Sequence, residues 1–272
     1  MKTLYVSDLD GTLLNSSQTT SEYTNNVINT LAEKGVLFSY ATARSYSTAR
    51  RAASGISAQI PLVVYNGTFV IDNLTGERLV SNFFQSDIKN VIQELIDGSV
   101  NPIIYSIIDD KEKFSYIEDK CNAGQRLFID SRKGDSRDNA VENEINLLKG
   151  NIFYISCIYD EKHLLSFYDK YKNQFNCLYQ KDIYDDMQWL EIMPLKATKA
   201  NGIQTLKELL SCDRIVAFGD GLNDMDMFKI ADECYAVSNA VDELKAIATG
   251  IIDSNNNDGV AKWLVENAEA FV

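Results

Sequence analysis

Asp8-Leu9-Asp10-Gly11-Thr12 is the stretch that says most about the fold, and it follows a short apolar run, Leu4-Tyr5-Val6-Ser7. In an extended chain, residues two apart point the same way, so Asp8 and Asp10 can face one site at the end of the expected strand. Gly11 then allows a sharp turn because it has no Cβ to clash. Taken alone, the segment could also be an acidic strand-to-helix turn without a function.

The segments around this motif alternate in a way that predicts a parallel sheet. Residues 20–34 have helical periodicity, residues 36–41 form a second expected strand, and helix and strand patterns continue over 45–54 and 62–65. The same alternation returns from residue 189 onward. Strands that alternate with helices favour a parallel sheet with helices on both faces. We therefore expect the fold class α/β, with a Rossmann-like parallel sheet core.

The middle of the chain differs in composition and in its expected secondary-structure pattern from the segments on either side. Residues 84–187 are richer in Tyr, Phe, Asn and Lys, and their expected helices and strands are joined by short, hairpin-like turns. We therefore predict an inserted α+β cap domain over 84–187. Residues 1–83 and 188–272 would then form one interrupted α/β core.

A second acidic segment, Gly219-Asp220-Gly221-Leu222-Asn223-Asp224, directly follows the strand expected over 215–218. Open α/β sheets bind ligands at the carboxyl ends of their strands. Four carboxylates that converge there would repel one another at neutral pH, and a divalent cation with oxygen ligands removes this repulsion. Few protein ligands completed by water suit Mg²⁺. A plain helix N-cap by Asn223 or Asp224 would explain one acidic residue but not the group.

Two further segments are candidates for binding an anion. Thr42 and Ala43 lie where an expected strand passes into a helix, and a hydroxyl with free backbone N–H groups at a helix N-terminus can hold a phosphate. Thr42 as an ordinary helix cap is an equally open reading of this segment. Lys199 begins the helix expected over 199–211, but by itself neither Lys199 nor its neighbour Lys196 stands out from surface lysines.

Charge and composition exclude several classes of partner. The chain has 26 Lys and Arg against 39 Asp and Glu, a net charge of −13, which repels nucleic acids and anionic membranes. An anionic substrate would therefore need local positive charge, which a bound metal ion supplies. The single histidine, His163, removes Ser-His-Asp and histidine-rich metal chemistry from consideration. Scattered cysteines and a start without a signal-peptide pattern predict a cytoplasmic protein.

These four segments, in this order, resemble the four motifs of the haloacid dehalogenase superfamily, and more closely its Cof-type sugar-phosphate phosphatases. Residues 8–12 resemble the first motif, Thr42 the second, Lys199 the third and residues 219–224 the fourth. The similarity extends over essentially the whole chain. It implies a Mg²⁺-dependent phosphatase that acts on a small-molecule phosphate ester. It also implies that residues 84–187 close over the core and select the substrate.

The resemblance also implies individual roles. Asp8 is the nucleophile that forms an aspartyl-phosphate, and Asp10 protonates the leaving alcohol and then activates water. Mg²⁺ is expected on the Asp8 carboxylate, the Asp10 backbone carbonyl and Asp220, with Asp224 in support. The residues expected to hold the phosphoryl oxygens are Thr42, Ala43, Lys199 and Asn223. Alignment and charge neutralisation of this kind are what phosphoryl transfer requires.

Two departures and two alternative functions stay open at this point. Ala43 and Ala200 stand where the family often has glycine, although neither removes a reacting group. The same motifs would serve a phosphomutase or phosphotransferase, in which the phosphoryl group passes to a sugar hydroxyl instead of water. A non-catalytic phosphometabolite-binding regulator is the other alternative, and the intact Asp8, Asp10 and Lys199 argue against it.

Overall fold

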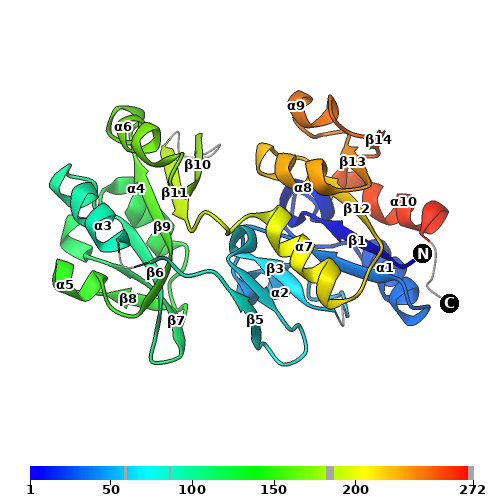
Figure 1. Ribbon diagram of the computed structural model, residues 1–272, viewed down its shortest axis with the longest axis horizontal. Helices are drawn as coiled ribbons and strands as arrows, with labels where there is room; N and C mark the ends of the chain where they lie inside the picture. Colours follow the sequence, from blue (N-terminus) through cyan, green and yellow to red (C-terminus); the bar gives the residue numbers. More distant parts are fainter. Residues whose placement is uncertain (58–59, 86, 182–186, 269–272) are drawn as a thin grey trace. The chain divides into compact units, whose positions relative to one another are not determined.

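The computed structural model of the chain describes residues 1–57, 60–85, 87–181 and 187–268. The chain divides into two compact units (Figure 1): Met1–Ser81 with Ala197–Val272, and Asn82–Lys196. The first unit is built from two separated stretches of sequence, and the second unit is the segment between them.

The first unit is organised around a five-stranded parallel sheet with the strand order β14-β13-β12-β1-β2. Its strands are β1 (Thr3–Ser7), β2 (Leu37–Tyr40), β12 (Arg214–Gly219), β13 (Glu233–Val237) and β14 (Gly250–Ile252). The apolar residues of β1 and β12 are almost completely buried, as strands covered on both faces require. The predicted α/β fold class with a parallel sheet is confirmed.

Six helices of the first unit surround this sheet among the described residues. They are α1 (Glu22–Glu33), α2 (Tyr46–Ala52), α7 (Lys199–Leu209), α8 (Met225–Ile230), α9 (Asp242–Lys245) and α10 (Gly259–Asn267). Helix α1 packs against α10, and α7 packs against α8. Hydroxyl caps define where three of these helices begin, because Ser21, Ser45 and Thr198 each accept a hydrogen bond from a backbone N–H in the first turn.

A small antiparallel sheet follows α2 in the first unit. It consists of β3 (Leu62–Val64), β4 (Phe69–Ile71) and β5 (Arg78–Ser81), and Val63 bridges to Ala41 at the end of β2. Strands β3 and β4 are joined by the tight turn η2 (Tyr65–Gly67), in which Asn66 has a φ of 52°. Strands β4 and β5 form an antiparallel hairpin.

The second unit is built on a six-stranded sheet with the order β10-β11-β9-β6-β7-β8. The strands are β6 (Ile103–Ile108), β7 (Lys111–Tyr116), β8 (Asp138–Ala140), β9 (Asn151–Tyr159), β10 (Asn176–Lys181) and β11 (Gln188–Met193). The helices are α3 (Ile88–Asp97), α4 (Ala123–Asp130), α5 (Glu144–Leu147) and α6 (Glu161–Tyr171). A hydrophobic core that includes Ile92, Leu95 and Leu164 packs α3 and α6 against this sheet.

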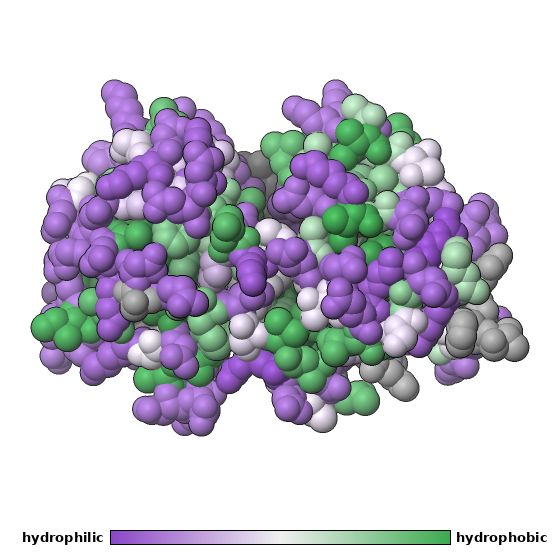
Figure 2. Space-filling view, viewed as in Figure 1, coloured by the Kyte–Doolittle hydropathy of each residue, from purple (hydrophilic) through white to green (hydrophobic). Residues whose placement is uncertain are grey.

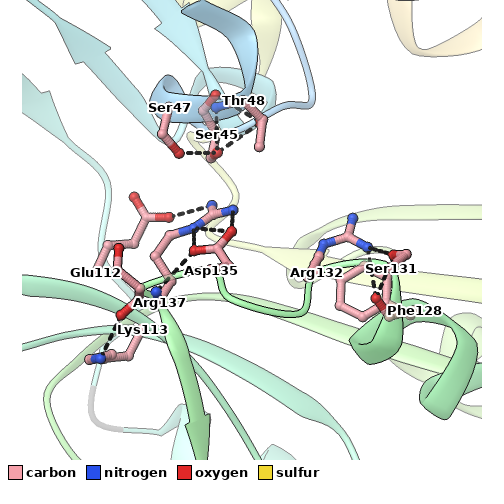
Figure 3. Close-up of polar contacts among 11 residues, drawn as sticks. Ser45, Ser47, Thr48, Glu112, Lys113, Phe128, Ser131, Arg132, Asp135 and Arg137 are labelled. Atoms are coloured by element: carbon pink, nitrogen blue, oxygen red, sulfur yellow. Dashed lines mark hydrogen bonds and ion pairs between the residues drawn. The ribbon is translucent and has the colours of Figure 1, made fainter. Parts of the chain in front are cut away.

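A buried arginine organises one end of this second sheet. Arg137, 8% exposed, donates to Glu112 at 2.8 Å and to Asp135 at 2.6 Å, as Figure 3 shows. The guanidinium of Arg132 lies 3.4 Å from the centre of the Phe128 ring. Both arginines thus have partners inside the second unit, and the charge of Arg137 is compensated by two carboxylates.

The boundary between the units differs from the one expected at residue 188. Strand β11 pairs with β9 and β10, so it belongs to the sheet of the second unit, which continues to Lys196. The reason is that the sequence of residues 189–192, Trp-Leu-Glu-Ile, predicts a strand but is compatible with either sheet. The sequence pattern defines a strand, but pairing decides which sheet it joins.

The surface has the character that the composition predicts. Figure 2 shows hydrophilic residues over most of the displayed face, with hydrophobic residues in scattered patches between them. Among the described residues, no helix has the length and apolar character that a bilayer crossing demands. All five cysteines have free thiols.

Candidate active site

Three neighbouring strands end at one edge of the core sheet, and each is followed by a candidate residue. Asp8 follows β1, Thr42 lies just beyond β2, and Asp220 follows β12. Strand β1 lies between the other two and runs parallel to both, and Ser7 is paired with Phe218 at the end of β12. Strand pairing therefore brings segments from the two ends of the chain to the same place.

The turn after β1 is shaped by Gly11 and held against the loop after β12. Gly11 has a φ of +75°, and a Cβ on it would lie 2.2 Å from Asp220 Oδ2. The Thr12 hydroxyl donates to Asp220 Oδ1 at 2.8 Å, and Asn239 Nδ2 donates to the Gly11 carbonyl at 2.8 Å. Glycine is thus required here for both its backbone angle and its lack of a side chain.

Lys199 lies at the centre of a buried charge cluster. Its Nζ is 2.8 Å from Asp8 Oδ1 and 2.7 Å from Asp224 Oδ1. The exposed fractions are 2% for Lys199, 4% for Asp8 and 0% for Asp224. Burial alone would lower the pKa of Lys199, but the Asp224 and Asp8 carboxylates outweigh it and raise that pKa. The lysine is therefore a fixed positive charge at neutral pH.

Asp224 is further held by the backbone of its own loop. Its Oδ2 accepts hydrogen bonds from the N–H groups of Asp220 at 2.9 Å and Gly221 at 3.0 Å. These bonds close the turn after β12 and leave its other oxygen for Lys199. Asp224 therefore positions both the loop and the lysine.

The donor set of this site fits a hard divalent cation. One carboxylate oxygen each from Asp8, Asp220 and Asp224 lie within 4.8 Å of one another. Three carboxylates face the single ammonium of Lys199, so two negative charges are left uncompensated. Burial, together with the Asp224 charge, raises the pKa of Asp8 well above its usual value and that of Asp220 to about 6. An oxygen-rich site with this excess charge suits Mg²⁺, and Asp8 and Asp220 are the residues that would hold it.

Asp10 is paired with an arginine that sequence reasoning did not assign. Arg44 Nε donates to Asp10 Oδ2 at 2.8 Å and its Nη2 donates to Asp10 Oδ1 at 2.6 Å. This two-pronged hydrogen bond raises the pKa of Arg44 and orients the Asp10 carboxyl, whose side chain is 49% exposed. In the sequence, Arg44 directly follows Thr42 and Ala43, which marks it as a neighbour of the expected phosphate-binding segment. Nothing in the sequence indicates that it pairs with Asp10.

The expected phosphate-binding residues are distributed around the cluster, and not all of them contact it. Thr42 is fully buried, and its hydroxyl accepts a hydrogen bond from Arg44 N at 3.1 Å. In the described part of the chain, neither Thr42 nor the half-buried Asn223 bonds to the acidic cluster. Ala43 is exposed and does not have a positive φ, and Ala200 lies within α7, so alanine is compatible with both positions.

Asn66 is a second polar residue beside the Thr42 loop that sequence reasoning did not assign. It is 3% exposed, and its backbone N–H donates to the Thr42 carbonyl at 2.9 Å. Within the described residues, both polar atoms of its side-chain amide are buried without a hydrogen-bond partner. A buried amide of this kind is a candidate for contact with a bound molecule. In sequence, Asn66-Gly67 looks like an ordinary hairpin turn.

The pKa of Asp220 predicts how stability depends on pH when no divalent ion is present. Its folded-state pKa of about 6 exceeds the ordinary value of 3.8, so the folded protein binds the proton more tightly than the unfolded chain. The Asp220 contribution to stability therefore falls as pH rises between these values. In EDTA, Asp220→Asn should gain stability over the wild type between pH 4 and about 6, and the difference should level off above that range.

Chemical unfolding of both proteins across that pH range measures this difference. Asp226→Asn, which removes an exposed carboxylate from α8, is the control for charge removal. A wild-type-to-variant difference that stays constant with pH would contradict the prediction.

A parallel α/β core with paired acidic loops at its strand ends, interrupted by an inserted second unit, defines a hydrolase of a known class. The chain belongs to the haloacid dehalogenase-like hydrolase family, whose model matches residues 5–264. The family assignment and the prediction of an enzyme are thereby confirmed.

Similar proteins span almost the entire chain. One, the "5-amino-6-(5-phospho-D-ribitylamino)uracil phosphatase YitU" of Bacillus subtilis, is 27% identical over 95% of each chain. Among solved structures, TM0651 from Thermotoga maritima matches with a TM-score of 0.79 and 23% identity over 99% of this chain and 98% of that one. The sugar phosphatase BT4131 matches with a TM-score of 0.75 and 18% identity over 98% of each chain. The structural matches support the fold.

Proposed function

We propose that this enzyme is a Mg²⁺-dependent phosphatase that hydrolyses small phosphorylated metabolites through an aspartyl-phosphate. The observation that carries the proposal is the buried cluster of Asp8, Asp220, Asp224 and Lys199 at the carboxyl ends of β1 and β12. An excess of carboxylate around one fixed ammonium is suited to a divalent cation and, with that cation bound, to a phosphoryl group.

Asp8 is the proposed nucleophile. Its Oδ1 is bonded to Lys199, and no hydrogen bond from the described residues occupies Oδ2. Attack by an Asp8 oxygen forms an O–P bond while the P–O bond to the alcohol breaks, and Asp10 gives the leaving oxygen its proton. Water then attacks phosphorus, Asp10 takes up a proton, and the Asp8–phosphorus bond breaks to release phosphate. Asp8 returns to its starting state.

The remaining residues hold charge in place during transfer. Asp8, the Asp10 carbonyl and Asp220 are proposed to hold Mg²⁺, with Asp224 in support, and the ion would neutralise phosphoryl charge. Lys199 contributes a positive charge that is already oriented. The other groups proposed to contact the phosphoryl oxygens are Thr42, the Ala43 backbone N–H and Asn223. Electrostatic positioning of this kind supplies most of the rate in phosphoryl transfer.

Substrate selection is proposed to reside in the inserted unit, as the resemblance of the motifs to those of Cof-type phosphatases implies. The phosphatase names of the relatives support a small phosphate ester, and sugar phosphates are the class proposed here. Cytoplasmic localisation stays a prediction, supported by the free cysteines.

Phosphate release from a panel of phosphorylated metabolites and one aryl phosphate tests the proposal. With Mg²⁺ we expect turnover of at least one sugar phosphate, and with EDTA we expect release to fall to background. Transfer of phosphate to an added sugar, with little free phosphate, would instead identify a phosphotransferase. Binding of metabolites without turnover under any Mg²⁺ condition would contradict the catalytic proposal.

A further inference from the structure

The first unit contains a hollow that none of the proposed catalytic residues lines. Its volume is about 590 Å³, and it lies between α2, residues 53–57 and the turn at residues 73–74. This volume is within the range of about 300–1,000 Å³ that is typical of sites for small ligands. Its lining includes the side chains of Tyr40, Tyr46, Ser47, Arg50 and Arg51.

The charge of this hollow is opposite to that of the protein as a whole. Arg50 and Arg51 are both exposed at the end of α2, and neither has a carboxylate partner among the described residues. No Asp or Glu is among the described residues that line the hollow. Two uncompensated guanidinium groups on a chain with a net charge of −13 are a local positive site.

Arg50 is held in place by the aromatic ring beside it. Its Nη1 donates to the Tyr46 hydroxyl at 3.2 Å, and its guanidinium lies 5.5 Å from the centre of the Tyr46 ring. Tyr46 in turn donates to the Asn73 carbonyl at 3.1 Å, which ties α2 to the turn between β4 and β5. The guanidinium therefore keeps donors available for a ligand while its position is fixed.

Tyr40 provides an independent indication of a ligand. It is 2% exposed and lines the hollow, yet its hydroxyl has no hydrogen-bond partner in the described part of the chain. Burial raises the pKa of Tyr40 although the Arg50 charge opposes this, so the hydroxyl keeps its proton and can donate. The ring of Tyr40 is buried, whereas its hydroxyl is not enclosed by the protein and is therefore a donor that an acceptor bound in the hollow can engage.

We propose that this hollow is a binding site for an oxyanion group of a small metabolite, either phosphate or carboxylate. Arg50 and Arg51 supply charge-assisted hydrogen bonds, the Tyr40 hydroxyl donates from the wall of the hollow, and the Ser47 hydroxyl is a further lining group. The site is separate from the carboxylate cluster of the proposed catalytic centre, since none of the residues of that cluster lines the hollow.

Calorimetric titration of the full-length protein with inorganic phosphate in EDTA tests this site. Without a divalent ion the catalytic carboxylates repel phosphate, so binding under these conditions reports the hollow beside α2. We expect one phosphate per chain, with affinity reduced about 10-fold or more in Arg50→Gln/Arg51→Gln. Tyr40→Phe should weaken binding several-fold because it removes only the donor. Citrate and sulfate titrations at equal ionic strength distinguish carboxylate from phosphate ligands.

A matched variant and a second measurement keep the outcome clear. Lys34→Gln/Lys229→Gln removes the same charge from exposed positions outside the hollow, and it should bind phosphate as the wild type does. Phosphate should raise the melting temperature of the wild type but not of the double arginine variant. Mg²⁺-dependent release from an aryl phosphate should be unchanged in that variant. No binding by the wild type, or equal losses in both double variants, would overturn the proposal.

Discussion

Asp8→Asn should lower phosphate release with Mg²⁺ by about 10⁴-fold or more, because an amide oxygen cannot replace the carboxylate nucleophile. The change is nearly isosteric. It removes a buried carboxyl group whose pKa is raised by burial, so the ionised form is costly in the folded protein. The variant should therefore fold, and in EDTA its free energy of unfolding should equal or exceed that of the wild type. Steady-state release from an aryl phosphate and from the best metabolite of the panel provides the measurement.

The matched control for this change is Asp226→Asn, which removes a carboxylate with 59% side-chain exposure a few residues beyond the acidic loop. It should retain activity close to that of the wild type. Phosphate that becomes trapped on wild-type protein in acid-quenched reactions, but not on Asp8→Asn, would further support the covalent intermediate. An Asp8→Asn protein that is folded and retains more than about a tenth of the activity would remove Asp8 from the nucleophile role.

Lys199→Met should combine the largest loss of stability with a large loss of activity. It leaves Asp8 and Asp224 buried, close together and without their shared cation. Removing one partner from a buried charge cluster costs about 3–5 kcal/mol of unfolding free energy, and we expect a loss in this range in EDTA. Activity should fall by about 10²-fold or more, because an oriented charge at the phosphoryl group is lost.

Two companion variants separate the causes of this loss. Lys196→Met changes the exposed lysine three positions earlier and should affect neither property strongly. Lys199→Met/Asp224→Asn also removes one of the two buried carboxylates that Lys199→Met leaves without a cation. It should therefore recover part of the lost stability but none of the activity. Urea unfolding measures the first property and phosphate release the second. Equal stability of Lys199→Met and the wild type would mean that Lys199 does not stabilise the fold by neutralising Asp8 and Asp224.

Much of the fold was accessible to sequence reasoning because its strands and helices have strong periodic patterns. The segments that became β1, α1, β2 and α7 were placed by their apolar patterns. Short elements such as β8 and β14 were not predicted, since their sequences, Asp-Asn-Ala and Gly-Ile-Ile, lack the continuous apolar run that marks β3. The sheet that β11 joins was predicted wrongly, because its pattern is the same for both sheets.

What the sequence determined by itself is the set of reacting groups: two acidic motifs after expected strands, a hydroxyl and a lysine in a known order. Tertiary structure alone decided how they are paired. Lys199 forms ion pairs with both Asp8 and Asp224. Arg44 forms a bidentate ion pair with Asp10. Arg50 and Arg51 line the same hollow as Tyr40. The physical reason is that local patterns record which face of an element is apolar. The pairing of charges depends on strand order and on burial, which exist only in the folded chain.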